Sequence, residues 1–293
     1  MCPRAEAFPK IEDRVTDAPH YRLDDLRRFA SALGSAVGLN PGRAAALATH
    51  LLWFDAAGAS PFGIETLADW LDRIEARQVD PAAEGRVTRE SIGTAILDGQ
   101  NGLPPLILER AGGVAVEKSR DAGVGLVRVE NIGPVGPSAC VVAEMAIGPT
   151  AALALGPGPS WALALPSDEG LPAVFDPALG AGQDRGKGGE ARPPVSAWPG
   201  SVAAWASALV PEGGWLVGAI AVAGLEPLAS FHERVGAAMR GAEGSPGRLA
   251  PVPWEARRRD AREHGVVVGA AAWKRLKRWA ERCDVTPPSP LHR

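Results

Sequence analysis

The chain has 293 residues, of which 46% are hydrophobic, and a net charge of −3, so it can bury a sizeable core and is not disordered as a whole. Its basic residues are scattered along most of the chain, which argues against nucleic acid as a partner. Its apolar runs are too short or too broken to cross a bilayer, and the N-terminus lacks the apolar run of a signal peptide. The three cysteines, Cys2, Cys140 and Cys283, lie far apart, so we expect a cytoplasmic protein. No histidines or cysteines stand at metal-ligand spacing, so we expect no metal site.

Three helices are predicted in the first part of the chain. Apolar residues recur at helical spacing over 26–37. Asn40-Pro41 is typical of an N-cap followed by the first helical residue and begins a second helix that runs to about Phe54. A third helix is predicted from Ile64 to Arg77, and its amphipathic pattern directs Arg73 toward water.

The middle of the chain alternates strands with helices. A strand over 95–99, a helix over 105–122 and a strand over 125–129 indicate an α/β layer. Further strands are predicted over 150–155, 161–165, 173–175 and 215–222, further helices over 202–209, 230–239, 254–264 and 271–283, and a loose link over 241–251. We expect one domain over 21–285, with two interleaved subdomains as the alternative. Tails are expected over 1–20 and 286–293, and a Gly/Pro-rich flexible excursion over 180–200.

One segment carries a resemblance to a known family. Residues 51–67, LLWFDAAGASPFGIETL, resemble the signature of the type-2 malate/L-lactate dehydrogenases, in which a helix ends in an Asp-Leu-Arg-Gly-type turn followed by Ser-His-Gly. Similar segments at 95–103, 231–235 and 254–285 follow in the family's order. The resemblance implies an α/β fold other than the doubly wound (Rossmann) domain, with helical N-terminal and C-terminal segments around a mixed sheet. It also implies a homodimer that uses NAD or NADP to reduce a 2-oxo acid or a cyclic imine.

The family's polar catalytic groups are replaced in this sequence. Ala57 stands where the family has its substrate-binding arginine, and Pro61 and Phe62 stand where it has serine and the catalytic histidine. Pro134 stands in place of a second family histidine. Reducing a carbonyl requires a proton donor and a cation that holds the substrate carboxylate. The resemblance therefore predicts a substrate pocket without an imidazole or a guanidinium.

A few candidate site residues remain. Asp176 matches the family's active-site aspartate, and its alternative role is a strand-end turn residue. Asn131 is retained either in the pocket or as a turn residue. His50 lies shortly before the altered loop and is either a catalytic imidazole or a structural helix residue. Gly156 and Gly158 lie in the turn that the resemblance aligns with a cofactor-binding turn of the family, and they are the candidate cofactor-binding residues.

These features leave open whether the chain is an enzyme. The leading hypothesis is a divergent homologue whose hydride transfer is reduced or lost and which has a binding or partner-subunit role. The alternative is an active NAD(P)H-dependent oxidoreductase with a rebuilt, more apolar site, in which Asp176 or a water that it holds delivers the proton. A third hypothesis is a heteromer with an intact paralogue. A small-molecule ligand is compatible with each.

Overall fold

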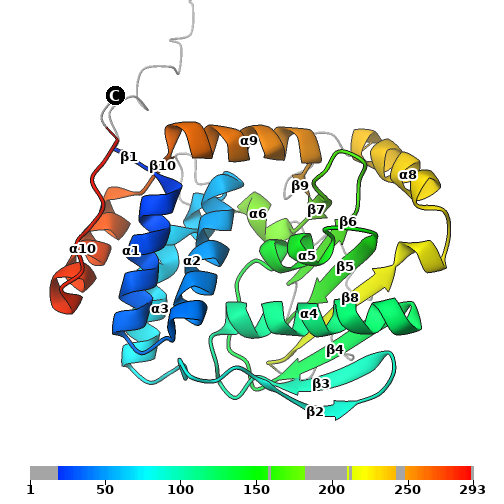
Figure 1. Cartoon of the computed structure of the whole chain (residues 1–293), viewed down its shortest axis with the longest axis horizontal. Helices are drawn as coiled ribbons and strands as arrows, with labels where there is room; N and C mark the ends of the chain where they lie inside the picture. The colour runs from blue at the N-terminus through cyan, green and yellow to red at the C-terminus, as the bar shows by residue number, and fades with distance from the viewer. Residues whose placement is uncertain (1–18, 158–159, 182–209, 211–212, 242–247, 292–293) are drawn as a thin grey trace, which may run out of the picture.

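The computed structural model describes residues 19–157, 160–181, 210, 213–241 and 248–291. A mixed sheet of eight strands in the order β2-β3-β4-β8-β5-β6-β7-β9 lies at its centre (Figure 1). The β3–β4 pair is parallel, and the other neighbouring pairs are antiparallel. The strands are β2 (Arg86–Glu90), β3 (Thr94–Asp98), β4 (Val124–Glu130), β5 (Thr150–Leu155), β6 (Trp161–Leu165), β7 (Ala173–Phe175), β8 (Trp215–Ala221) and β9 (Arg248–Leu249). A separate antiparallel pair joins β1 (His20–Tyr21) to β10 (Val266–Val267).

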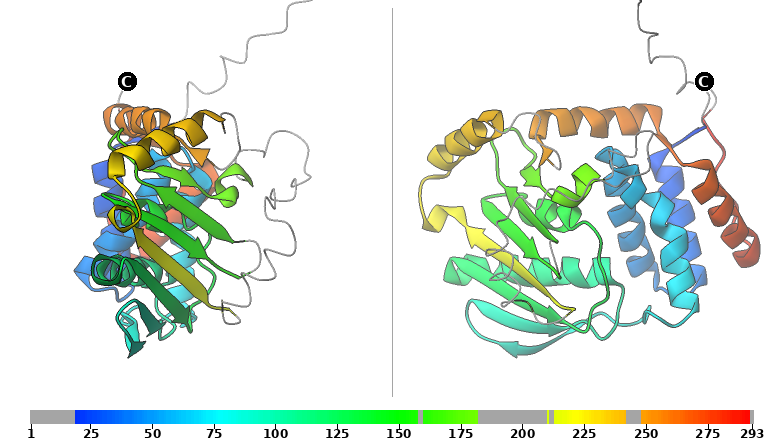
Figure 2. Two further views of the ribbon diagram at one scale, coloured as in Figure 1. Left: turned by 90° about the vertical axis from the view of Figure 1, so that its right-hand side faces the viewer. Right: turned by 180° about the vertical axis from the view of Figure 1, so that it is seen from behind.

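The helices form two groups. The long α4 and the short α5 cover the same face of the sheet, whereas α1, α2, α3 and α10 lie together beside it (Figures 1 and 2). The α-helices are α1 (Leu23–Ala36), α2 (Pro41–Ala56), α3 (Leu67–Glu75), α4 (Pro104–Ala122), α5 (Ala139–Met145), α6 (Pro177–Ala181), α8 (Leu228–Gly241), α9 (Pro251–His264) and α10 (Ala270–Cys283). Three 3-10 turns are η2 (Ser60–Phe62), η3 (Ile64–Thr66) and η4 (Val222–Gly224). No helix in the described part of the chain is long and apolar enough to cross a membrane.

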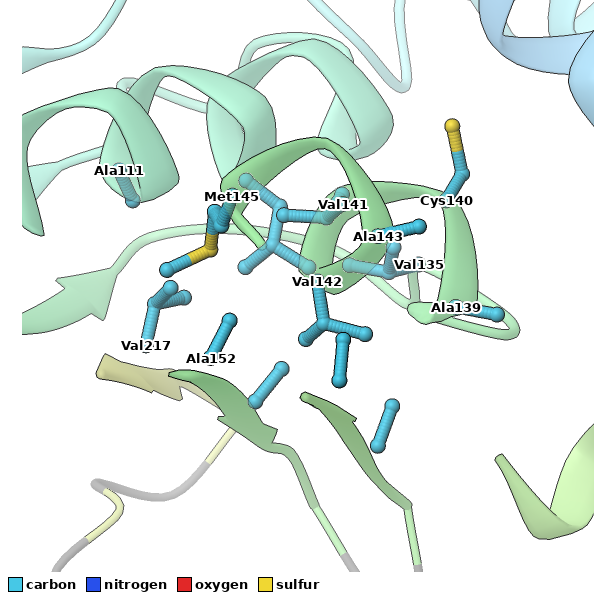
Figure 3. Close-up of a cluster of buried hydrophobic side chains, with 14 of the residues drawn as sticks. Ala111, Val135, Ala139, Cys140, Val141, Val142, Ala143, Met145, Ala152 and Val217 are labelled. Atoms are coloured by element: carbon cyan, nitrogen blue, oxygen red, sulfur yellow. The ribbon is translucent and has the colours of Figure 1, made fainter. Parts of the chain in front are cut away.

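The buried side chains form two hydrophobic clusters, one between the sheet and the helices α4 and α5, and one among α1, α2, α3 and α10. In the sheet cluster, Val142 and Met145 of α5 face Ala152 and Val217 of the strands (Figure 3). Gly125 of β4 allows a close approach to α4, because a β-carbon there would overlap a backbone carbonyl oxygen of that helix. The helical cluster is built by apolar stripes on α1, α2, α3 and α10. Each fully buried leucine or phenylalanine contributes about 2 kcal/mol.

The sequence predicts most of these elements. The Asn40 side chain accepts a hydrogen bond from the Arg43 amide at 2.8 Å, which confirms the predicted N-cap of α2. The predicted strands over 150–155, 161–165 and 173–175 have the observed bounds. The third helix begins with the 3-10 turn η3 and ends at Glu75, and residue 77 has a positive φ of 55°. The mixed α/β class with helices around the sheet is confirmed.

Some predictions differ from the structure. Helix α5 is not predicted, because its sequence ACVVAEM is almost entirely apolar and gives no helical period. The segment 241–251, predicted to be a loose link, contains β9 and the first residue of α9. Most of the predicted excursion over 180–200, the helix over 202–209 and most of the N-terminal tail lie outside the described residues.

Candidate functional site

The two altered family segments meet at one cavity of about 250 Å³. Phe62 of η2 lies on one part of its wall, and Pro134, in the loop after β4, lies on another. His50 from α2 and Arg73 from α3 also line it, together with Trp70. The two positions that the resemblance aligns with family histidines therefore lie at one cavity, and Phe62 and Pro134 have no transferable side-chain proton.

The turn between α2 and η3 is held by Asp55, Gly58 and Gly63. Gly58 has a positive φ of 79°, a conformation that favours glycine. A β-carbon at Gly63 would clash with the carboxyl group of Asp55. Asp55 in turn accepts a hydrogen bond from the Ile64 amide at 2.8 Å, and this bond ties the turn to the end of α2. These three residues shape the loop without contributing to the cavity wall.

The carboxyl group of Asp55 is almost completely buried, with 4% of the residue exposed. Burial raises the pKa of Asp55 to about 7, and the Ile64 amide opposes the shift only in part. The Ser60 hydroxyl lies near enough to favour the carboxylate, but it makes no hydrogen bond of normal geometry, and Oδ1 has no partner. Asp55 is therefore an unfavourably buried carboxyl directly beneath the altered loop.

The other predicted pocket residues lie away from the cavity wall. Ala57 is buried, and its carbonyl oxygen accepts a hydrogen bond of 3.0 Å from Arg257 of α9. Pro61 is exposed at the surface of η2. Asn131 has a positive φ of 51°, and its side chain donates a hydrogen bond to Asp98 at 3.0 Å. This geometry is that of a turn residue.

Two expectations about the cavity are wrong. The helical pattern directs Arg73 toward water, yet this residue lines the cavity with its guanidinium carbon 4.7 Å from the centre of the Trp70 ring. The resemblance predicts a cavity that lacks both an imidazole and a guanidinium, whereas His50 and Arg73 supply one of each. The predicted direction fails because α3 packs against the loop after β4, which covers the face that the sequence pattern leaves polar.

The imidazole of His50 is held in place by Glu109, a residue that does not line this cavity. Its Nδ1 lies 2.7 Å from a carboxylate oxygen of Glu109 on α4, and its ring packs edge-on against Phe54 at 5.5 Å. Only 4% of His50 is exposed. A buried imidazole with a carboxylate partner has a fixed orientation.

Asp176 lies outside the cavity and binds backbone amides. One carboxylate oxygen accepts hydrogen bonds from the amides of Ser138 and Ala139 at the start of α5, and the other accepts from Ala178 in α6, each at 2.9 Å. Burial raises the pKa of Asp176 to about 6 despite these bonds. In this structure Asp176 links the first turns of two helices.

The predicted cofactor turn is only partly described, because Gly158 lies outside the described residues. The Gly156 amide donates to the Ser160 carbonyl at 2.7 Å, which closes the turn between β5 and β6. A β-carbon on Gly156 would lie 2.6 Å from the indole ring of Trp215. The space beside this glycine is therefore filled by an indole, and a larger residue at position 156 would clash with it.

Several residues near the site have no clear signal in the sequence. Glu109 and Cys140 approach His50 from α4 and α5, although they lie far from it along the chain. Arg257 belongs to a charged helix whose pattern is typical of a solvent-facing element, and yet it packs on the turn at Gly58. Local periodicity carries no information on such contacts between elements.

Comparisons with known proteins agree with the resemblance. The sequence profile described as malate/L-lactate dehydrogenase matches residues 21–149. The malate dehydrogenase of Pyrococcus abyssi is 28% identical over 123 residues, which are 41% of this chain and 34% of that protein. The L-sulfolactate dehydrogenase of Methanocaldococcus jannaschii is 27% identical over 77 residues, which are 26% of this chain and 22% of that protein. The match thus spans about a third or less of the length of these curated relatives.

Solved structures extend the likeness to the whole fold. Malate dehydrogenase from Entamoeba histolytica has a TM-score of 0.79 and 18% identity, covering 93% of this chain and 100% of that one. Delta1-piperideine-2-carboxylate reductase from Pseudomonas syringae has a TM-score of 0.70 and 18% identity, covering 89% of this chain and 99% of that one. These likenesses confirm the predicted type-2 malate/L-lactate dehydrogenase fold. The profile match thus covers residues 21–149, which are less than half of the chain, and the solved structures show that the rest shares the fold.

Proposed function

We propose that the chain is a divergent member of this oxidoreductase family in which hydride transfer is reduced or lost, and that its cavity binds a small organic carboxylate. The observation that carries the proposal is the meeting of Phe62 and Pro134 at one cavity. A phenyl ring and a pyrrolidine ring cannot donate a proton to a developing alkoxide, so among the described residues His50 is the one imidazole of this wall from which a proton could come. The turnover assay below tests whether His50 performs this step.

Arg73 favours a carboxylate as the ligand. Among the described residues no carboxylate pairs with its guanidinium within 4.0 Å, so its charge is not neutralised by an ion pair. Guanidinium and carboxylate groups form paired, charge-assisted hydrogen bonds. Phe54, Phe62 and Val135 make part of the wall apolar, so the ligand should carry an apolar group beside its carboxylate. Asp69 also lines the cavity, but its carboxylate is paired with Arg275 at 2.6 Å. A volume of about 250 Å³ restricts it to a small molecule.

A turnover assay tests the loss of hydride transfer. The purified chain is incubated with NADH or NADPH and a panel of 2-oxo acids and cyclic imines, and cofactor oxidation is followed by absorbance. We expect no oxidation above the rate without protein, and no change of NADH or NADPH fluorescence on titration. Steady turnover of any member of the panel would refute this part of the proposal.

The anion site is tested with the substitution Arg73→Gln. Calorimetric titration with apolar 2-oxo acids such as phenylpyruvate should give a dissociation constant at least tenfold larger than that of the wild type, or about 1.4 kcal/mol, because the charge-assisted pair is lost. Arg77→Gln is the matched control, since Arg77 is exposed just beyond α3 and does not line the cavity. Equal affinity of Arg73→Gln and wild type, or no binding to the wild type, would contradict the site.

A second candidate is an active NAD(P)H-dependent oxidoreductase with a rebuilt, more apolar substrate site. Arg73 favours this candidate, because it provides a guanidinium at the cavity, whereas Ala57 stands at the position where the family has its substrate-binding arginine. Substrate and cofactor would then bind together, and the turnover assay separates the two candidates.

The proposal includes a homodimer, as the resemblance implies, with a heteromer containing an intact paralogue as the alternative. Light scattering on the purified chain should give twice the chain mass of 30.4 kDa. A monomer that copurifies with a second family member from the native host would favour the heteromer.

A further inference from the structure

A second cavity, of about 530 Å³, lies between α2, α4 and α5. His50 lines this cavity as well as the first one, so it forms part of the wall between them. Glu109, Cys140 and Glu144 line only the second cavity. The proposed function uses none of these three side chains.

The geometry points to a binding site for a divalent transition-metal ion of the Zn²⁺ class, formed by His50, Glu109 and Cys140. One nitrogen, one oxygen and one sulfur atom from these residues all lie within 4.8 Å of one another. Each comes from a different helix, so the ligands are held by the packing of α2, α4 and α5. An ion between them would replace the direct hydrogen bond between His50 and Glu109 and require only small side-chain rotations.

The orientation of Cys140 supports the assignment. In Figure 3 the side chain of Val142 turns toward the strands, whereas the sulfur of Cys140 points away from them. The thiol is therefore directed from α5 toward the second cavity rather than into the sheet core. Only 3% of Cys140 is exposed, so its surroundings are fixed by the fold.

The set of ligands is one that zinc prefers. Imidazole nitrogen, thiolate sulfur and carboxylate oxygen all bind Zn²⁺, and sites with three protein ligands leave a fourth position open to water or another group. Glu144 reaches the same cavity and remains partly accessible to solvent, so it is placed to approach the open position directly or through water. The His50 ring packs edge-on against Phe54 at 5.5 Å, which limits its rotation.

Partial burial and the nearby Glu109 raise the pKa of Glu144, whereas Arg258 and His50 oppose the shift. Burial, Glu109 and Glu144 raise the pKa of the Cys140 thiol well above its usual value, so this thiol is protonated in the metal-free protein. A bound dication would deprotonate the thiol and release its proton to solvent.

This site does not depend on the proposed carboxylate cavity or on any remaining catalysis. It differs from the sequence-based expectation of no metal site, which rested on local spacing alone. The three ligands occupy positions 50, 109 and 140, and only the tertiary structure brings them together.

Cobalt spectroscopy tests the site, because Co²⁺ substitutes for Zn²⁺ and is coloured. Chelator-treated full-length protein is titrated with Co²⁺ alone. We expect a thiolate-to-cobalt charge-transfer band in the near ultraviolet, visible bands of tetrahedral intensity, and their loss on addition of one equivalent of Zn²⁺. The double variant Cys2→Ser/Cys283→Ser, in which Cys140 is the sole remaining cysteine, should give the same spectrum. Cys140→Ser should lose the charge-transfer band.

Glu109→Gln provides a readout that does not depend on replacing a buried thiol. Glu109 is partly exposed, with 31% of its side chain accessible, so the variant is expected to fold. It should keep the charge-transfer band and bind Co²⁺ at least tenfold more weakly. Absence of the band in wild type, its loss in Cys2→Ser/Cys283→Ser, its persistence in Cys140→Ser, or unchanged Co²⁺ affinity in Glu109→Gln would overturn the inference. Far-UV circular dichroism and melting curves identify any variant that fails to fold. If Cys140→Ser fails to fold, the Co²⁺ affinity of Glu109→Gln decides whether the site exists.

Discussion

Asp55→Asn should stabilise the folded chain by up to about 4 kcal/mol at pH 8 and by less than half as much at pH 5. The reason is the pKa of Asp55, which burial raises from 3.8 to about 7. A difference of one in pKa between the folded and unfolded states corresponds to about 1.4 kcal/mol. An asparagine keeps the acceptor for the Ile64 amide and never carries the charge whose burial is unfavourable.

The direction of the pH dependence follows from proton binding. Between about pH 4 and pH 7 the folded chain holds a proton on Asp55 that the unfolded chain has released, so wild-type stability falls as the pH rises through this range. Above pH 7 both states are ionised and the full penalty is reached. Glu65 adds to the effect, because its charge disfavours a second negative charge nearby.

Urea unfolding curves at pH 5 and pH 8 measure this difference. Asp121→Asn is the matched control, because Asp121 is exposed at the end of α4 and its substitution should give the same small change at both pH values. The interpretation fails if Asp55→Asn is no more stable than wild type at pH 8, or if its gain is the same at pH 5.

Asp176→Ala should lower the free energy of unfolding by about 3 kcal/mol at pH 8. The substitution leaves the amides of Ser138, Ala139 and Ala178 without their acceptor, and hydrogen bonds to a charged group contribute about 1.5–3 kcal/mol each. The sum is reduced because burial of the carboxylate is itself unfavourable, as the pKa of about 6 indicates. Asp176→Asn should lose less, since its one carbonyl oxygen can still accept from α5 or α6.

The same substitutions separate a capping role from a role at the substrate. If Asp176 only caps α5 and α6, then folded Asp176→Asn binds the 2-oxo acid probe as the wild type does, because Asp176 does not line the cavity. Asp168→Ala is the control for stability, since Asp168 is exposed in a turn of the same region. A loss below 1 kcal/mol for Asp176→Ala, or impaired probe binding in folded Asp176→Asn, would contradict the capping role.

Local sequence patterns predict those helices and strands whose ends carry capping or turn residues or whose apolar residues recur at a regular spacing. Asn40-Pro41 fixes the start of α2, and alternating apolar residues bounded by Gly and Pro locate β5 and β6. Helix α5 escapes prediction because it is buried on nearly every side and has no polar face. The resemblance at 51–67 anticipates which catalytic side chains are replaced, and the structure places Phe62 and Pro134 at a common cavity.

The sequence by itself therefore determined most of the elements and the fold class, because these depend on patterns among neighbours along the chain. Only the tertiary structure decided that Arg73 lines the cavity and that His50, Glu109 and Cys140 meet. The physical reason is that hydrophobic periodicity identifies the face of a helix that is buried, but not the element that covers the other face. For α3 that element is the loop after β4, and for His50 it is the pair α4 and α5.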